Sequence, residues 1–253
     1  MSIERCQLPD GRRAVRKRHR DAIGARGEAA GLAAIAAVAG APPVPELIAC
    51  EGATLLLADL GAGAASPAAW ERFAQQLAAL HRHHGPAFGF AVTTCCGPTP
   101  QPNPWTPDGH AFVAEHRLRF LARACRDAGA LPASVVREVE RIADRLGSLV
   151  PTQPPSLLHG DLWHGNAHAA ADGRIHLIDP ACWYGWAECD IAMTRLFGGF
   201  PQLFYDAYLA AHPLPAGWQQ RCELHNLYHL MNHALLFGGG YAREAAAVAR
   251  RWA

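Results

Sequence analysis

The feature that most constrains the fold of this chain is a run of ten residues, "LLHGDLWHGN", at positions 157–166. It places a carboxylate, Asp161, directly after a short apolar stretch that is typical of a buried strand, and an asparagine, Asn166, five positions later. Thirteen residues beyond Asn166, a second strand-like run, "RIHLID", ends in Asp179. We expect a fold in which these two strand ends bring three oxygen-bearing side chains together.

This spacing predicts phosphoryl transfer. The pattern D-x-x-x-x-N, followed by an acid at a strand end, is typical of the catalytic loop and metal site of phosphotransferases. A substrate hydroxyl needs a carboxylate to accept its proton, which is the role predicted for Asp161. Magnesium prefers hard oxygen donors, which Asn166 and Asp179 supply. We therefore predict ATP and Mg²⁺ as cofactors.

The use of basic residues points to the same chemistry. The chain has 22 arginines and a single lysine, Lys17, in the strand-like segment "RAVRKRH". Glu28 lies on the helical segment that follows. Kinase folds hold the α- and β-phosphates with a strand lysine that a helix glutamate orients. Taken alone, the single lysine could equally be a chance survivor in an arginine-biased sequence.

The chain reads as two parts. Residues 1–60 predict a small β-rich lobe with one helix, and residues 61–253 a large, mostly helical lobe. The fold class is therefore α+β, with a two-lobed, protein-kinase-like architecture. In the small lobe we expect strands around 13–19, 46–50 and 53–60, followed by a linker at "GAGAAS". The large lobe is expected to begin with a helix capped by Ser66, followed by a long loop over 85–109. Further helices are expected over about 110–129 and 132–149, and three more helical stretches in 187–253.

Composition excludes several functions. The net charge is +1, so no global field favours nucleic acid, and the basic run from Arg12 to Arg20 is typical of a solvated strand edge. The most apolar window, "EAAGLAAIAAVAGAPPVP", is too short to span a bilayer.

No signal-like segment opens the chain, and the eight cysteines form no C-x-x-C pair, so we expect free thiols and a cytoplasmic protein. We favour a monomer.

Three stretches carry a family resemblance: "LLHGDLWHGN", "IDPACWYGWAECDIAMTRLFGGF" and "LYHLMNHALLFGGGY". They resemble the fructosamine (ketosamine) kinase family, which is related to aminoglycoside phosphotransferases and choline kinases. The resemblance covers roughly residues 8–242. It implies ATP-dependent phosphorylation of the sugar 3-hydroxyl of ketosamines, either free or on proteins, as a step in deglycation.

The resemblance also implies roles for individual residues. Asp161 resembles the family's catalytic base, Asn166 and Asp179 its magnesium ligands, and Lys17 and Glu28 its phosphate-holding pair. Asp59 and Leu60 occupy the hinge between the lobes, where backbone groups would meet the adenine; the family more often has Glu at the first of these positions.

The candidate substrate contacts are five residues: Trp105, His159, Trp163, Glu188 and Asp190. Trp163 lies two residues past the base and suits stacking on a sugar, with core packing as the alternative. Glu188 and Asp190 begin a helix, where the dipole favours acids in any case; alternatively, they shape the catalytic loop or meet the substrate amine.

One departure from the family concerns the first strands. The family opens with a strand, a glycine-rich turn and a second strand before the lysine strand, whereas about ten residues precede "DGRRAVRKRH" here. We therefore expect a shortened small lobe of about four strands, without the glycine-rich loop.

Two other functions remain open. The same fold could phosphorylate another small acceptor, such as an aminoglycoside or a choline-like alcohol. A catalytically impaired nucleotide-binding protein is the third possibility, against which the presence of Lys17, Asp161, Asn166 and Asp179 argues.

Overall fold

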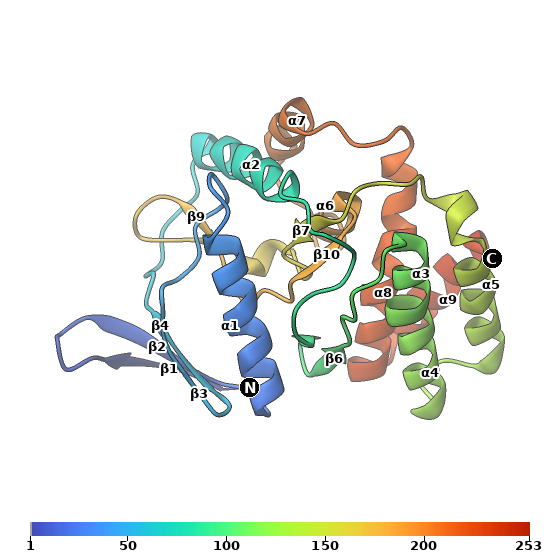
Figure 1. Ribbon diagram of the computed structural model, residues 1–253, viewed down its shortest axis with the longest axis horizontal. Coiled ribbons are helices and arrows are strands. Elements are labelled where there is room, and N and C mark those ends of the chain that lie inside the picture. The colour runs from blue at the N-terminus through green and yellow to red at the C-terminus, as the bar shows by residue number, and fades with distance from the viewer. Residues whose placement is uncertain (1) are drawn as a thin grey trace.

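A computed structural model describes residues 2–253 and shows a strand-rich lobe beside a larger helical lobe (Figure 1). In the small lobe, four antiparallel strands form a sheet in the order β1-β2-β4-β3. Their bounds are Ser2–Gln7, Arg13–Arg18, Thr54–Ala58 and Leu47–Glu51 in that order. This confirms the expected number of strands.

Helix α1 (Ala22–Ala36) packs against this sheet (Figure 1). Asp21 caps the helix by accepting hydrogen bonds from the backbone N–H groups of Ile23 and Gly24, each at 3.0 Å. The buried faces of α1 and β4 meet through Leu32 and Leu55, which form a small core of their own. Strand β2 buries Ala14 and Lys17 on opposite faces of the sheet and exposes its arginines, so the sole lysine is a buried residue of the lobe.

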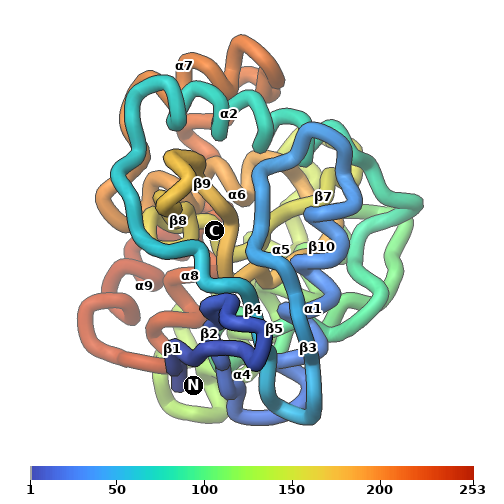
Figure 2. Tube along the Cα trace, turned by 90° about the vertical axis from the view of Figure 1, so that its left-hand side faces the viewer, coloured from blue at the N-terminus to red at the C-terminus, as the bar shows by residue number. Residues whose placement is uncertain are grey.

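The segment from Asp59 to Ser66 joins the lobes and is held along its length. In Figure 2 it runs from β4 past β8 and β9 to α2. The Gly63 N–H donates to Ala169 O at 2.9 Å, and the Ala171 N–H donates to Leu60 O at 3.0 Å. These bonds tie the linker to the hairpin of β8 (Ala167–Ala169) and β9 (Ile175–Leu177).

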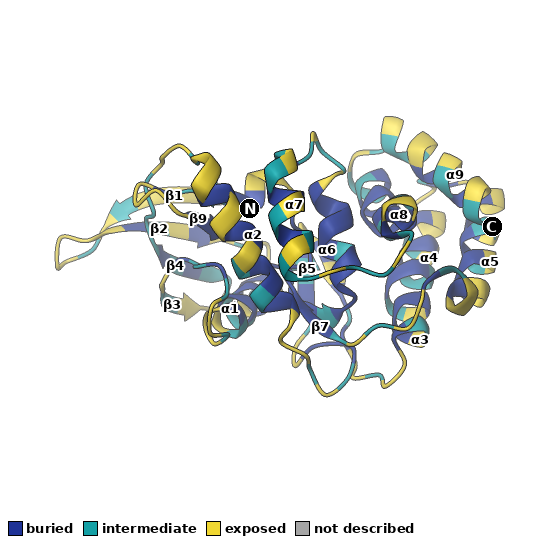
Figure 3. Ribbon diagram, turned by 90° about the horizontal axis from the view of Figure 1, so that it is seen from above, coloured by how far each residue is buried: buried dark blue, intermediate teal, exposed yellow. Residues whose placement is uncertain are grey.

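The large lobe buries one continuous apolar core among its helices. Its elements are α2 (Pro67–His81), α3 (Gly109–Val113), a π-helical segment (Ala114–Arg119), α4 (Phe120–Asp127), α5 (Ala133–Leu149), α6 (Ala187–Thr194), α7 (Gln202–Ala211), α8 (Trp218–Phe237) and α9 (Gly240–Trp252). Ser66 caps α2 as predicted. Figure 3 shows that α9 exposes one face and buries the other, against α8 and α5.

Two expectations about the large lobe were incomplete. The loop over 85–109 contains a short hairpin, β5 (Thr94–Cys96) and β6 (Thr99–Gln101). The prediction of three helical stretches after residue 187 was wrong, because the described residues contain four there. The break between α8 and α9 is only two glycines, Gly238 and Gly239, which both adopt positive φ and turn the chain without a longer loop. No helix within residues 2–253 is long and apolar enough to cross a membrane.

The linker contact yields a first prediction. A methyl group on Gly63 would collide with the carbonyl of Ala170, so Gly63→Ala must displace the linker from the β8–β9 hairpin. We expect a fall in unfolding free energy of about 1–3 kcal/mol and weaker ATP binding, measured by urea unfolding and calorimetry.

The matched control is Gly147→Ala in the exposed face of α5, where an added methyl group meets no atom within 4 Å. It should be neutral or stabilise the protein by about 0.5–1 kcal/mol. Equal stability of the two variants would contradict the role given to the linker contact.

Candidate active site

A buried carboxylate on α6 holds the catalytic loop in place. Strand β7 (Ser156–Leu158) leads into His159 and Gly160, and β10 (Trp183–Gly185) pairs alongside it. The Asp190 carboxylate accepts hydrogen bonds from the His159 N–H at 2.7 Å and the Gly160 N–H at 2.9 Å, and contacts His81 Nε2 at 3.2 Å. Burial alone would raise the pKa of Asp190, but His81 and these donors hold it below its usual value.

Gly160 allows the turn that follows. Its φ is +83°, and a side chain there would collide with the carbonyl of Ala181. The chain can therefore pass directly behind the segment after Asp179 and present Asp161 at the far side of the turn.

Asp161 and Asn166 are joined within this loop. The Asn166 side-chain nitrogen donates to Asp161 O at 2.8 Å and approaches Asp161 Oδ2 at 3.4 Å. Both contacts use the nitrogen of the carboxamide, so its oxygen remains available for a cation. Burial, followed by the negative charge of Asp179, raises the pKa of Asp161 to about 7. A cation bound at Asp179 would offset the second of these causes.

Lys17 joins the lobes electrostatically. Its Nζ lies 2.6 Å from Glu28 Oε2 and forms an ion pair with Asp179 Oδ1. His19 Nε2 lies 2.9 Å from the same Glu28 oxygen. Burial would raise the pKa of Glu28, but His19 and Lys17 hold it below its usual value. The lysine and the glutamate thus pair as expected from the sequence, and the ion pair of Lys17 with Asp179 is an addition that the sequence did not predict.

Asp179 adopts an unusual backbone conformation. Its φ of +55° is in the left-handed region, which non-glycine residues rarely adopt and which is frequent at functional sites. In this conformation its carboxylate forms the ion pair with Lys17. Asp179 and Asn166 are hard oxygen donors on one loop system, a set that suits Mg²⁺.

A cleft lies under the small sheet beside Lys17 and Asp179. Its walls are mostly apolar and include Ile3, Val15, Leu57, Leu60 and Ile178. The hinge residues line it too, but the Asp59 side chain is engaged locally: it accepts from the Gly61 N–H at 2.9 Å and lies 3.7 Å from Arg5 Nε. Apolar walls with charges at one end suit a nucleotide.

A second pocket, of about 390 Å³, opens on the other side of Asp161. That volume suits a small molecule. Aromatic side chains form much of its wall: Trp163, Phe197, Phe237 and Tyr241. Trp163 is 40% exposed and meets Phe197 edge to face at 6.3 Å, so the core-packing alternative for this residue does not hold. Asp161 is the carboxylate in the lining.

Three candidate substrate contacts lie elsewhere. His159 is fully buried, and its Nε2 contacts Ile178 O at 2.9 Å. Glu188 is buried in an ion pair with Arg221 (2.6 Å) and also contacts His225 (3.0 Å). Trp105 packs near Tyr184 outside the residues that line the pocket. We therefore do not propose these three as substrate contacts, and Asp190 acts on the loop rather than on substrate.

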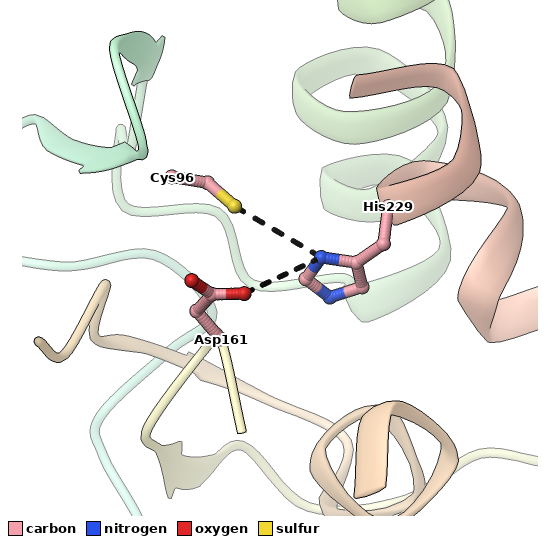
Figure 4. A group of neighbouring side chains, drawn as sticks. All are labelled: Cys96, Asp161 and His229. Atoms are coloured by element: carbon pink, nitrogen blue, oxygen red, sulfur yellow. Dashed lines mark hydrogen bonds and ion pairs between the residues drawn. The ribbon is translucent and has the colours of Figure 1, made fainter. Parts of the chain in front are cut away.

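Sequence reasoning missed two residues beside the base. Cys96 on β5 and His229 on α8 both face Asp161 (Figure 4). Burial raises the pKa of the Cys96 thiol well above its usual value, and burial together with His233 lowers the pKa of His229 to about 3. Both side chains are therefore neutral in the isolated protein. No sequence spacing links them to Asp161.

The hydrogen bonds from the catalytic loop to Asp190 yield a second prediction. Asp190→Ala leaves the N–H groups of His159 and Gly160 buried without their acceptor, so we expect the unfolding free energy to fall by about 3–5 kcal/mol in urea unfolding.

The matched control is Asp206→Ala on the exposed side of α7, where the carboxylate accepts a hydrogen bond from Gln202. Its effect should stay within about 0.5 kcal/mol. If Asp190→Ala and the control variant unfold with the same urea midpoint, Asp190 does not hold the loop.

Comparison with known proteins agrees with this geometry. The fructosamine kinase family model matches residues 16–252. A probable ketoamine kinase of Synechocystis is 46% identical over 225 residues, which cover 86% of this chain and 75% of that protein. Another, from Vibrio parahaemolyticus, is 42% identical over 69% of this chain but only 60% of its own length.

Solved structures agree as well. A crystal structure assigned as a fructosamine-3-kinase from Thermobifida fusca has a TM-score of 0.90 and 36% identity, covering 98% of this chain and 88% of that one. A choline kinase from Streptococcus pneumoniae, at 12% identity and a TM-score of 0.60 over 99% of this chain and 92% of that one, shows likeness of fold alone. The fold is protein-kinase-like, and the chain belongs to the fructosamine kinase family of small-molecule kinases.

Proposed function

We propose that this protein transfers the γ-phosphoryl group of ATP to the sugar 3-hydroxyl of a ketosamine, and that this transfer serves deglycation. The observation that carries the proposal is the position of the catalytic loop between two pockets. Asp161 lines the aromatic pocket, and Asp179, joined to Lys17, lines the nucleotide cleft. A phosphoryl group held at Asp179 and a hydroxyl held at Asp161 would then face each other.

In the proposed reaction, the acceptor oxygen forms a bond to the γ-phosphorus as the bond from that phosphorus to the ADP oxygen breaks. Asp161 takes the hydroxyl proton. Lys17, held by Glu28, pairs with the phosphates in place of its present partner Asp179. Asn166 and Asp179 would hold Mg²⁺, which neutralises phosphate charge when bound. The remaining contribution of the protein is positioning and exclusion of water.

The aromatic wall supports a sugar-bearing acceptor. Trp163 and Phe197 present flat apolar surfaces beside Asp161, and such surfaces suit the C–H faces of a sugar. The names of the ketoamine kinase relatives support the ketosamine within this class.

A panel of acceptors tests the proposed function. Purified protein with Mg-ATP is offered fructosyl-, ribulosyl- and erythrulosyl-amines, an aminoglycoside and choline, and ADP formation and phosphorylated product are both measured. We expect ketosamine-dependent product. Product from the aminoglycoside or choline alone would assign another acceptor, and nucleotide binding without any product would assign a catalytically impaired protein.

The base assignment gives a third prediction. Asp161→Asn keeps the shape of the loop but removes the proton acceptor, so we expect turnover to fall by about a hundred- to ten-thousand-fold with ATP affinity nearly unchanged. Single-turnover transfer and calorimetric ATP binding measure the two effects. A variant that keeps half of the wild-type turnover would show that the proton goes elsewhere.

The fourth prediction concerns Lys17. Lys17→Arg should be nearly as damaging as Lys17→Ala, because a planar guanidinium does not fit the buried space between Glu28 and Asp179 that a compact ammonium fills. The Michaelis constant for ATP and the turnover number report the loss. Arg18→Lys, an exposed exchange on the same strand, is the control and should behave as wild type.

A further inference from the structure

Three side chains from distant parts of the chain converge beside the catalytic loop. Cys96 ends β5, Asp161 follows β7, and His229 lies in the middle of α8. Figure 4 shows the thiol, the carboxylate and the imidazole directed toward one another. One ligand atom from each lies within 4.8 Å of the other two, and among residues 2–253 this is the one such group of three metal-binding side chains.

The distances are close to those of a metal site. Cys96 Sγ lies 3.9 Å from His229 Nδ1, which lies 4.0 Å from Asp161 Oδ1. In tetrahedral zinc coordination, sulfur, nitrogen and oxygen ligands are about 3.4–3.6 Å apart, from bond lengths of about 2.0–2.3 Å. The two distances to His229 Nδ1 exceed this spacing by about half an ångström, and the sulfur and the carboxylate oxygen lie within 4.8 Å of each other. Side-chain rotation can close such gaps around one ion.

The surroundings hold two of these ligands in position. Asn232, one turn of α8 beyond His229, accepts from Thr99 Oγ1 at 2.6 Å and donates to Cys96 O at 3.2 Å. Gln101 donates to Tyr228, next to His229, at 2.7 Å. The hairpin that carries Cys96 is thus fixed against the helix that carries His229, so little ordering remains for an ion to impose.

The fourth coordination position is accessible. Cys96 and Asp161 both line the aromatic pocket, so an ion between them can enter from the pocket and keep a water molecule there. Three protein ligands with one open position are typical of zinc sites that are not purely structural.

We infer that Cys96, Asp161 and His229 form a binding site for one zinc ion, and that the bound ion occupies the carboxylate needed for phosphoryl transfer. The inhibition, though not the binding, rests on the proposed function of Asp161. Binding exchanges the thiol proton of Cys96 for the metal.

The chemistry of the ligands separates this site from the magnesium site. Asn166 and Asp179 offer only oxygen, which suits Mg²⁺, whereas a thiolate with an imidazole selects zinc over magnesium. Asp161 lies between the two sets, so zinc would act without displacing the nucleotide's own cation.

Binding is tested with cobalt as a spectroscopic substitute for zinc, on the full chain without nucleotide. We expect one equivalent of Co²⁺ to give the near-ultraviolet absorption of a cobalt–thiolate bond, and Zn²⁺ to displace it. Cys96→Ser should abolish the absorption, and His229→Gln should weaken or shift it. The matched control is Cys189→Ser, since Cys189 also contacts a histidine, His225, at 3.6 Å but is outside this group.

Inhibition is tested separately, with Mg-ATP and acceptor present and zinc added in a metal buffer. Cys96→Ser should raise the inhibitory zinc concentration by at least about ten-fold, since even outer partners of metal ligands change affinity by about 10- to 100-fold.

The outcomes are distinct. Cobalt absorption that is absent, or unchanged in Cys96→Ser, overturns the site. Absorption that depends on Cys96, without zinc inhibition, supports the metal site and overturns the inference that the bound ion occupies a carboxylate needed for transfer. Equal zinc inhibition of wild type and Cys96→Ser places the inhibitory ion elsewhere and overturns the inference that this site blocks transfer.

Discussion

The active site depends on one buried carboxylate. Asp190 is almost fully buried, and it accepts from the backbone of His159 and Gly160 while contacting His81. The loop that carries Asp161 is therefore positioned by Asp190, a residue outside the proposed substrate pocket. A charge in this position is stable only while all of its partners are present, because an unpaired buried carboxylate costs several kcal/mol, on the order of 3–5. The same contacts join α2, β7 and α6, so the rigidity of the helical lobe is passed to the loop.

A second constraint is electrostatic. Lys17 lies between Glu28 and Asp179 and joins the small lobe to the loop system of the large one. In the proposed reaction the phosphates take over part of this pairing. The ion pair thus keeps the cleft in order before the nucleotide arrives, and the tied linker at Gly63 limits how far the lobes can separate.

Asp161 takes part both in the proposed phosphoryl transfer and in the inferred zinc site. On one side, Asp161 accepts a hydrogen bond from Asn166, one of the two residues proposed to hold magnesium. On the other side, it faces the thiol of Cys96 and the imidazole of His229. Burial raises the pKa of this carboxylate, which suits a proton acceptor, and the same partial burial places it against the thiol and the imidazole. The proposed activity and the inferred zinc site therefore follow from the same burial.

The sequence by itself determined the fold class and the candidate catalytic residues, because both follow from motifs with a fixed spacing along the chain. The spacing of Asp161, Asn166 and Asp179, together with the single Lys17, predicted a kinase-like fold and the pairing of Lys17 with Glu28. The few residues before the lysine strand predicted a small sheet of about four strands. Only the tertiary structure decided what adjacent acids do. Glu188 and Asp190 are two residues apart on a helix, hence about 200° apart around its axis, so one meets Arg221 and the other the catalytic loop. Likewise, Cys96 and His229 are brought to Asp161 by the docking of a hairpin on α8, a contact across more than half the chain that no local pattern encodes.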